Sequence, residues 1–150
     1  MYGDGAVVID RSEIRSLDRA STNNNGYVAA PATKRSNRYG ILFTRSRFTS
    51  TARAGTVSLG RPWHPNSDPD AVGQVLIRDS TLGAHVRTAQ PWTDMGGFSW
   101  RTAGRFAEYA NTGPGAAVNA DRPQLSAADA ASYTPQAYLS GPDAWNPVLP

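Results

Sequence analysis

The sequence of 150 residues contains no cysteine, a single lysine and no long hydrophobic run. The absence of cysteine excludes a disulfide scaffold, a cysteine-ligated zinc site and a cysteine nucleophile. No apolar segment approaches the roughly 18 residues that cross a membrane, so we expect no membrane partner. Met1 is followed directly by Tyr2-Gly3-Asp4-Gly5, without the basic and apolar regions of a secretory leader, so we expect no signal peptide in this chain.

Several motifs of catalysis and binding are also missing. The sequence has no Gly-x-Ser-x-Gly turn, no Walker loop and no Gly-x-Gly-x-x-Gly fingerprint. His64 and His85 do not have the spacing of ligands to one metal ion, so we expect no metal site. The basic residues are scattered and no nucleic-acid-binding module is present, which argues against a nucleic-acid partner.

The charge that is present is almost all arginine on the positive side. The chain has 15 Lys plus Arg against 12 Asp plus Glu, a formal net charge of +3, and only Lys34 is a lysine. Arginine suits planar, bidentate contact with a carboxylate or a phosphate. The balance is therefore compatible with a polyanionic partner such as an acidic polysaccharide, and equally with a solvated surface that carries a small excess of arginine.

Short strand-like segments dominate the first two-thirds of the chain and predict an all-β fold. Each is rich in β-branched or aromatic residues and is bounded by Gly, Pro, Asn, Asp or Ser. They cover residues 6–9, 26–30, 39–43, 55–59, 72–78 and 106–110. No gap between them contains a long amphipathic helix. Short strands with irregular connections favour a solenoid of parallel strands, but no crisp internal repeat is evident, so a β-sandwich stays open on pattern alone.

The last part of the chain, residues 122–150, reads as a helical and extended C-terminal cap. Ser126 is placed as a helix N-cap with Asp129 three residues later, and Thr134 precedes a proline at the first helical position, Pro135. We therefore expect short C-terminal helices that form a cap over the β body, as fits a solenoid whose end must be covered.

The segment Leu59-Gly60-Arg61-Pro62-Trp63 is the most informative candidate site. Residues two apart in an extended chain point to the same side, so Arg61 and Trp63 can present a cation and a flat aromatic face to one cleft. A guanidinium can bind a carboxylate, and an aromatic face can stack on a sugar ring. The alternative is structural: the tryptophan fills the edge of the core and the arginine forms a nearby salt bridge.

A second aromatic cluster, Trp92 to Trp100, lies in a loop that contains glycine. Loops with several large apolar residues are either packed onto the core or line a binding site. By contrast, the strand and sharp turn of residues 106–116 are typical of a purely structural element.

Taken in order along the chain, these motifs resemble the pectinesterase family. Leu-Gly-Arg-Pro-Trp at 59–63 is followed by Glu-Tyr-x-Asn-x-Gly-Pro-Gly-Ala at 108–116, with the segment Trp92-Thr93-Asp94-Met95 between them as in the bacterial branch. The resemblance covers nearly the whole chain and corresponds to the C-terminal half of the family. It favours the functional interpretation of Arg61 and Trp63.

The resemblance implies a right-handed, single-stranded parallel β-helix that is incomplete at its N-terminal side, with residues 1–150 as one portion of that domain. It implies hydrolysis of the methyl esters of polygalacturonate (pectin), with release of methanol and no cofactor. In this family an arginine hydrogen-bonds a nucleophilic aspartate, a role that falls on Arg61, and aromatic and methionine side chains contact the sugar, roles that fall on Tyr2, Trp63 and Met95. Family resemblance further implies an extracellular, monomeric protein.

The resemblance also places the family's two catalytic aspartates outside this sequence. The nucleophile of the family lies in an Asp-Phe-Ile-Phe-Gly motif, and Met1-Tyr2-Gly3 corresponds to the end of that motif. Both aspartates would thus precede Met1, and Asp4 lies on the wrong side of the glycine to replace one. We therefore expect the isolated chain to be inactive as an ester hydrolase, and the alternative function is a non-catalytic β-solenoid that binds acidic polysaccharide.

Overall fold

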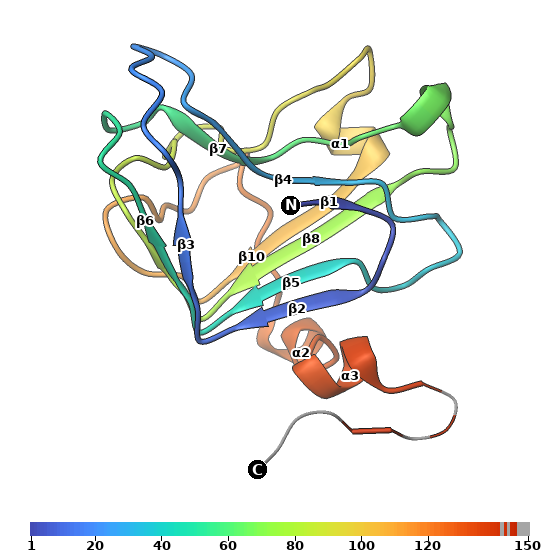
Figure 1. Ribbon diagram of the computed structural model, residues 1–150. Coiled ribbons are helices and arrows are strands. Elements are labelled where there is room, and N and C mark those ends of the chain that lie inside the picture. Colours follow the sequence, from blue (N-terminus) through green and yellow to red (C-terminus); the bar gives the residue numbers. More distant parts are fainter. Residues whose placement is uncertain (142, 144, 147–150) are drawn as a thin grey trace.

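The computed structural model describes residues 1–141, 143, 145 and 146, and these form a right-handed parallel β-helix (Figure 1). Its strands make three sheets, in the orders β1-β4-β7, β10-β8-β5-β2 and β3-β6-β9, and every pairing between them is parallel. The strands are Tyr2–Gly3 (β1), Val7–Asp10 (β2), Glu13–Arg15 (β3), Gly26–Pro31 (β4), Ile41–Thr44 (β5), Arg47–Thr49 (β6), Val57–Gly60 (β7), Gly73–Arg78 (β8), Thr81–Leu82 (β9) and Gly104–Tyr109 (β10). The all-β solenoid prediction is confirmed, and the β-sandwich alternative is wrong.

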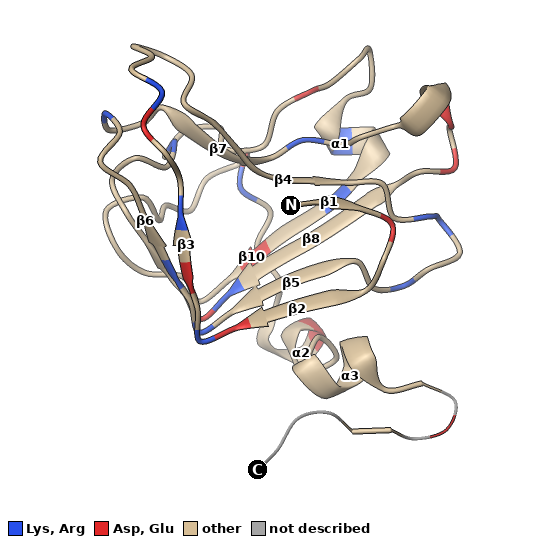
Figure 2. Ribbon diagram, viewed as in Figure 1, with Lys and Arg blue, Asp and Glu red and all other residues tan. Residues whose placement is uncertain are grey.

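Successive coils place apolar side chains at equivalent positions inside the solenoid. Ile41 pairs with Val75, and Val75 pairs with Phe106 on the next coil. All three are at most 5% exposed and belong to one continuous core cluster. This stacking buries in every coil a face that no single coil could bury alone. The charged residues lie mainly at strand ends and in turns (Figure 2).

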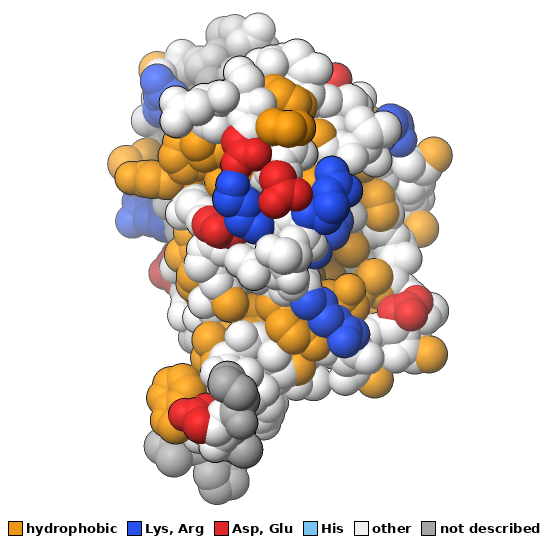
Figure 3. Space-filling view, turned by 90° about the vertical axis from the view of Figure 1, so that its right-hand side faces the viewer, with side chains coloured by type: hydrophobic (Ala, Val, Ile, Leu, Met, Phe, Trp, Pro, Cys, Tyr) orange, Lys and Arg blue, Asp and Glu red, His pale blue; other side chains and the backbone are white. Residues whose placement is uncertain are grey.

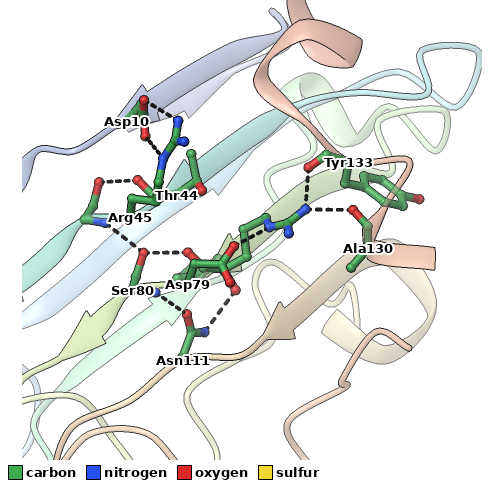
Figure 4. A network of polar contacts seen from close by, with 11 residues as sticks. Asp10, Thr44, Arg45, Asp79, Ser80, Asn111, Ala130 and Tyr133 are labelled. Carbon is green, nitrogen blue, oxygen red and sulfur yellow. Dashed lines mark hydrogen bonds and ion pairs between the residues drawn. The ribbon is translucent and has the colours of Figure 1, made fainter. Parts of the chain in front are cut away.

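A ladder of hydrogen bonds runs along the turn between the second and third sheets, and Figure 4 shows the part of it around Ser80 and Asn111. The amide of Ser12 donates to the Oγ of Ser46, that of Ser46 to the Oγ of Ser80, and that of Ser80 to Oδ1 of Asn111, each at 3.1 Å. The residue before each rung has a positive φ, which turns the chain sharply at that point. The ladder reveals an internal repeat, with steps of 34, 34 and 31 residues, that composition alone did not show.

The expected C-terminal helices are present, but they lie against the outer face of the second sheet, beside β2, and not over the end of the solenoid (Figure 1). Helices α2 (Ala127–Ala130) and α3 (Pro135–Leu139) begin after Ser126 and Thr134, whose side chains accept hydrogen bonds from the backbone as predicted. Tyr138 packs on Leu42 and Leu76 of that sheet. Within the expected cap over 122–150, positions 142, 144 and 147–150 lie outside the described residues.

Two connections help to position the candidate site. A short 3-10 turn, η1 (Pro65–Ser67), follows β7, and helix α1 (Trp100–Ala103) leads into β10.

The guanidinium of Arg78 donates to the carbonyls of Ala130 and Tyr133 and so ties the C-terminal segment to β8 (Figure 4). In the described part of the chain, no helix has the length and apolar character of a membrane span.

Candidate active site

The backbone that carries Arg61 and Trp63 is held from both neighbouring coils. The amides of Arg61 and Trp63 donate to Ala29 and Pro31 on one side, at 3.2 and 3.0 Å. On the other side, Gly60 accepts a hydrogen bond from the amide of Thr93 at 3.0 Å. Glycine at position 60 allows this close approach, because a Cβ there would lie 3.0 Å from the ring of Trp92 and 3.1 Å from a backbone oxygen, and one of them would have to shift. The segment is therefore a fixed platform rather than a mobile loop.

The side chain of Arg61 is half-buried and lies over an aromatic ring of the preceding coil. Its Cζ is 4.0 Å from the ring centroid of Tyr27 on β4. The Nε atom is buried and has no acceptor, and no carboxylate among the described residues forms an ion pair with this guanidinium. The nearby salt bridge of the structural alternative is thus absent from the described part of the chain, and the guanidinium keeps donors available.

Arg61 lines a cavity of about 520 Å³ together with Tyr2 and Tyr27. Arg15 and Arg19 also contribute to its wall, and no acidic side chain does. The cavity wall thus combines arginines and aromatic rings with apolar residues such as Ile14 and Leu17 and contains no carboxylate, a composition compatible with an anionic ligand. Arg61, predicted as the catalytic arginine, and Tyr2, predicted as a substrate contact, therefore line the same cavity.

Trp63 lies next to this cavity and reaches it through Tyr2. The two rings meet edge to face, with centroids 5.6 Å apart and planes at 83°. Tyr2 is 77% exposed, whereas Trp63 is half-buried. The pair forms a partly exposed aromatic surface beside Arg61, which is an arrangement that can stack on a sugar.

Met95 is carried by a tight hairpin beside this surface. The backbone of Met95 exchanges two hydrogen bonds with that of Phe98, and both glycines between them have positive φ, so the turn depends on glycine. Phe98 in turn stacks on His64, with ring centroids 3.6 Å apart and planes at 7°. Met95 is half-buried and does not line the cavity of Arg61 and Tyr2. Met95 is thus connected to the segment of Trp63 only indirectly, through its backbone pairing with Phe98 and the stacking of Phe98 on His64.

The second aromatic cluster divides into core and site. Trp92 is fully buried and stacks on Phe106 with ring centroids 4.8 Å apart, and Trp100 is 4% exposed. Met95 and Phe98 stay half-buried at the surface. The packing expectation is therefore confirmed for Trp92 and Trp100, whereas a binding role for the partly exposed part of the loop stays a prediction.

Charges around the site are interleaved. Asp68 and Lys34 form an ion pair that joins the loop after Trp63 to the loop after β4, and their hydrogen bond lowers the pKa of Asp68 and raises that of Lys34. Asp4 accepts a hydrogen bond from the amide of Lys34 at 2.7 Å and does not line the cavity of Arg61. Acidic and basic side chains gather together on this face (Figure 3). The described residues offer no cluster that could hold a metal ion.

Comparison with known proteins agrees with this geometry. The model of the Pectinesterase family matches residues 1–142. The chain belongs to the pectinesterase family. Pectinesterase A of Dickeya chrysanthemi is 34% identical over all of this chain and 45% of its own length. A pectinesterase of Ralstonia solanacearum is 36% identical over 77% of this chain and 34% of its own length.

Solved pectinesterase structures give the same result. Pectin methylesterase PemA from Erwinia chrysanthemi superimposes with a TM-score of 0.90 and 34% identity, covering all of this chain and 48% of that one. A pectin methylesterase in complex with a hexasaccharide gives 0.86 and 32% identity, again over the whole chain and 48% of the neighbour. This pectinesterase chain thus spans about half the length of the relatives it matches.

Sequence reasoning missed two residues of the site. Tyr27 lies within a predicted strand, but nothing in its local pattern shows that the parallel register places its ring under Arg61. The sequence assigns His64 no role beyond lacking metal-ligand spacing with His85, whereas in the structure its ring stacks on Phe98 and its Nδ1–H donates to the carbonyl oxygen of Asp68 at 2.8 Å. Its position next to Trp63 was the one available signal.

Proposed function

We propose that this chain forms part of a pectin methylesterase, and that it contributes the arginine and the sugar-binding surface of the active site. The observation that carries the proposal is the guanidinium of Arg61, which lies in a cavity with Tyr2 and Tyr27 and has no carboxylate partner among the described residues. An arginine that keeps its donors free is suited to bind a carboxylate, either of a catalytic aspartate or of galacturonate.

The chemistry follows from the charge of Arg61. Ester hydrolysis by a carboxylate nucleophile requires that carboxylate to be ionised, and an adjacent guanidinium lowers its pKa. The resemblance assigns neither the family's nucleophile nor its acid–base aspartate to a residue of this sequence, and we propose that Arg61 is the catalytic group that this chain supplies. We further propose that the protein acts outside the cell, where its polymeric substrate is found.

The same arrangement defines how substrate would lie on the chain. Trp63 and Tyr2 offer aromatic faces for sugar rings, and Met95 lies on the adjoining hairpin as a further apolar contact. Methylated polygalacturonate carries both free carboxylates and apolar methyl esters. It therefore matches a site that combines a free arginine with aromatic and thioether groups.

The second candidate is a non-catalytic module that binds acidic polysaccharide. It is favoured for the isolated chain because no described carboxylate forms an ion pair with Arg61, as the nucleophile of the family would. Both candidates require the chain to bind polygalacturonate. Neither requires the isolated chain to release methanol, but such a release would be compatible only with the first candidate.

The test measures both properties on the purified 150-residue chain. We expect it to bind partly methylated polygalacturonate in preference to uncharged dextran, with methanol release equal to that of a buffer blank. Failure to bind either form of polygalacturonate, methylated or de-esterified, would overturn the proposed function. Methanol release above the blank would show that the chain holds a nucleophile of its own and would eliminate the non-catalytic candidate.

A further inference from the structure

The contacts of Arg61 single out Tyr27 as more than a strand residue. Tyr27 sits on β4, one coil before Arg61, and its ring lies under the guanidinium with the Cζ atom 4.0 Å from the ring centroid. Within the described part of the chain, the side chain of Arg61 donates no hydrogen bond and forms no ion pair. Its Nε atom is buried without an acceptor. The aromatic ring is therefore the contact that fixes this side chain.

This mode of support differs from a salt bridge in one important respect. A cation over an aromatic face is attracted to the ring without using its N–H donors, which point outward in the plane of the guanidinium. A carboxylate partner would instead occupy those donors. Arg61 can thus be held in place and still bind an incoming carboxylate with its full set of donors.

Tyr27 is itself well placed to hold the arginine. Its hydroxyl accepts a hydrogen bond from Nδ2 of Asn24 at 3.3 Å. The asparagine-rich loop before β4 is braced by Asn25, which is 4% exposed and donates to the Oγ1 of Thr56 at 2.9 Å. The polar loop that precedes Tyr27 is consequently ordered, and it connects to the site through the tyrosine hydroxyl.

We propose that Tyr27 is a positioning residue for Arg61, which it holds beneath the site with its donors directed to a carboxylate. The function of that carboxylate rests on the proposed activity, whereas the positioning itself does not. Tyr27 acts through Arg61 and need not touch substrate.

The first test examines Arg61 without any ligand. NMR of the 150-residue chain with isotope-labelled arginine reports whether the Arg61 side chain lies over a ring. The Arg61 signal is assigned as the one that disappears in the Arg61→Lys variant. We expect the Arg61 side-chain protons to be shifted upfield in the wild type and in Tyr27→Phe, and to move to ordinary values in Tyr27→Leu. Unchanged Arg61 signals in Tyr27→Leu would overturn the proposal.

A matched control is available on another sheet. Arg78 lies over Tyr109, with its Cζ 5.2 Å from the ring centroid, but it is also held by Asp79 and two backbone carbonyls. Tyr109→Leu removes a similar half-buried tyrosine from a strand and should leave Arg61 unchanged. Thermal unfolding of both leucine variants measures any general loss of folding, and Tyr27→Phe keeps the ring if the leucine variant fails to fold.

The second test examines binding of polygalacturonate. We expect Tyr27→Leu to weaken binding about fivefold to tenfold, in line with the loss of one cation–π contact. Tyr27→Phe should retain most of the affinity, and Tyr27→Leu should have no further effect in an Arg61→Ala background. Equal affinity of the wild type and Tyr27→Leu, or full additivity with Arg61→Ala, would overturn the proposal. If the wild type does not bind at all, the proposed function fails and the NMR result alone decides the role of Tyr27.

Discussion

The buried ion pair between Glu108 and Arg122 offers a large and specific test of how the last coil is held. Glu108 is 1% exposed and Arg122 is fully buried. The Nε and Nη2 atoms of Arg122 donate to the two carboxylate oxygens at 2.9 and 2.6 Å, and Nη1 donates to the carbonyl of Gly115 at 2.7 Å. The pair therefore joins β10 to the turn and to the segment after it.

Replacing Arg122 by methionine would leave the carboxylate of Glu108 buried with only Asn111 as a hydrogen-bond donor from a side chain, at 3.3 Å. Removing one partner of a buried pair costs about 3–5 kcal/mol. For a chain of this size that loss lowers the melting temperature by about 6–20 °C. Urea unfolding measures the change directly, provided that the slope with urea concentration stays the same.

Two controls sharpen the result. The double variant Glu108→Leu/Arg122→Met removes both charges and should recover most of the lost stability. Arg101→Met breaks the exposed ion pair with Asp121 and should cost no more than about 1 kcal/mol. If Arg122→Met costs as little as Arg101→Met, the reasoning from burial is refuted.

Three further perturbations test other parts of the structure. Burial lowers the pKa of His85 from its ordinary value of 6.5, so the unfolded chain binds more protons just below that pH. The free energy of unfolding should therefore fall as the pH drops below about 6.5, and His85→Leu should flatten this dependence in urea titrations at several pH values; a wild type without such a slope would contradict the assignment. The amide of Phe98 closes the hairpin, and His64→Ala should speed its hydrogen exchange, whereas His64→Tyr keeps an aromatic ring and should not. Identical exchange rates in both variants would argue that the stacking does not stabilise the hairpin. Ser46→Ala removes an acceptor of the ladder and should cost about 1–3 kcal/mol, clearly more than Ser36→Ala at an exposed position, and equal costs would show that the ladder does not stabilise the coils.

The longer strands were predictable from the sequence, because each fills a core with β-branched and aromatic residues between clear boundaries. All six predicted segments overlap an observed strand. Strands β1, β3, β6 and β9 have only two or three residues, too few to show any periodicity, and they form through pairing with the neighbouring coil. The repeat was missed for a related reason: its signal is a serine hydroxyl in a turn and not a hydrophobic pattern.

The candidate site was predictable only in part. The motif around Arg61 and Trp63 shows in the sequence because the two residues are close along the chain. Tyr27 contacts Arg61 across 34 positions, through the register between β4 and β7, which no local pattern specifies. The stacking of His64 on Phe98 likewise depends on how two loops from different coils meet.

The central claim is that Arg61 binds a carboxylate-bearing sugar polymer, and a calorimetric titration with partly methylated oligogalacturonate tests it most directly. We compare the wild type with Arg61→Ala and with Arg47→Ala, which removes the same charge from an exposed position on β6. Loss of a hydrogen bond to a charged group predicts binding about 10- to 100-fold weaker in Arg61→Ala, and affinity close to that of the wild type in Arg47→Ala. Equal affinities of the two alanine variants would contradict the account.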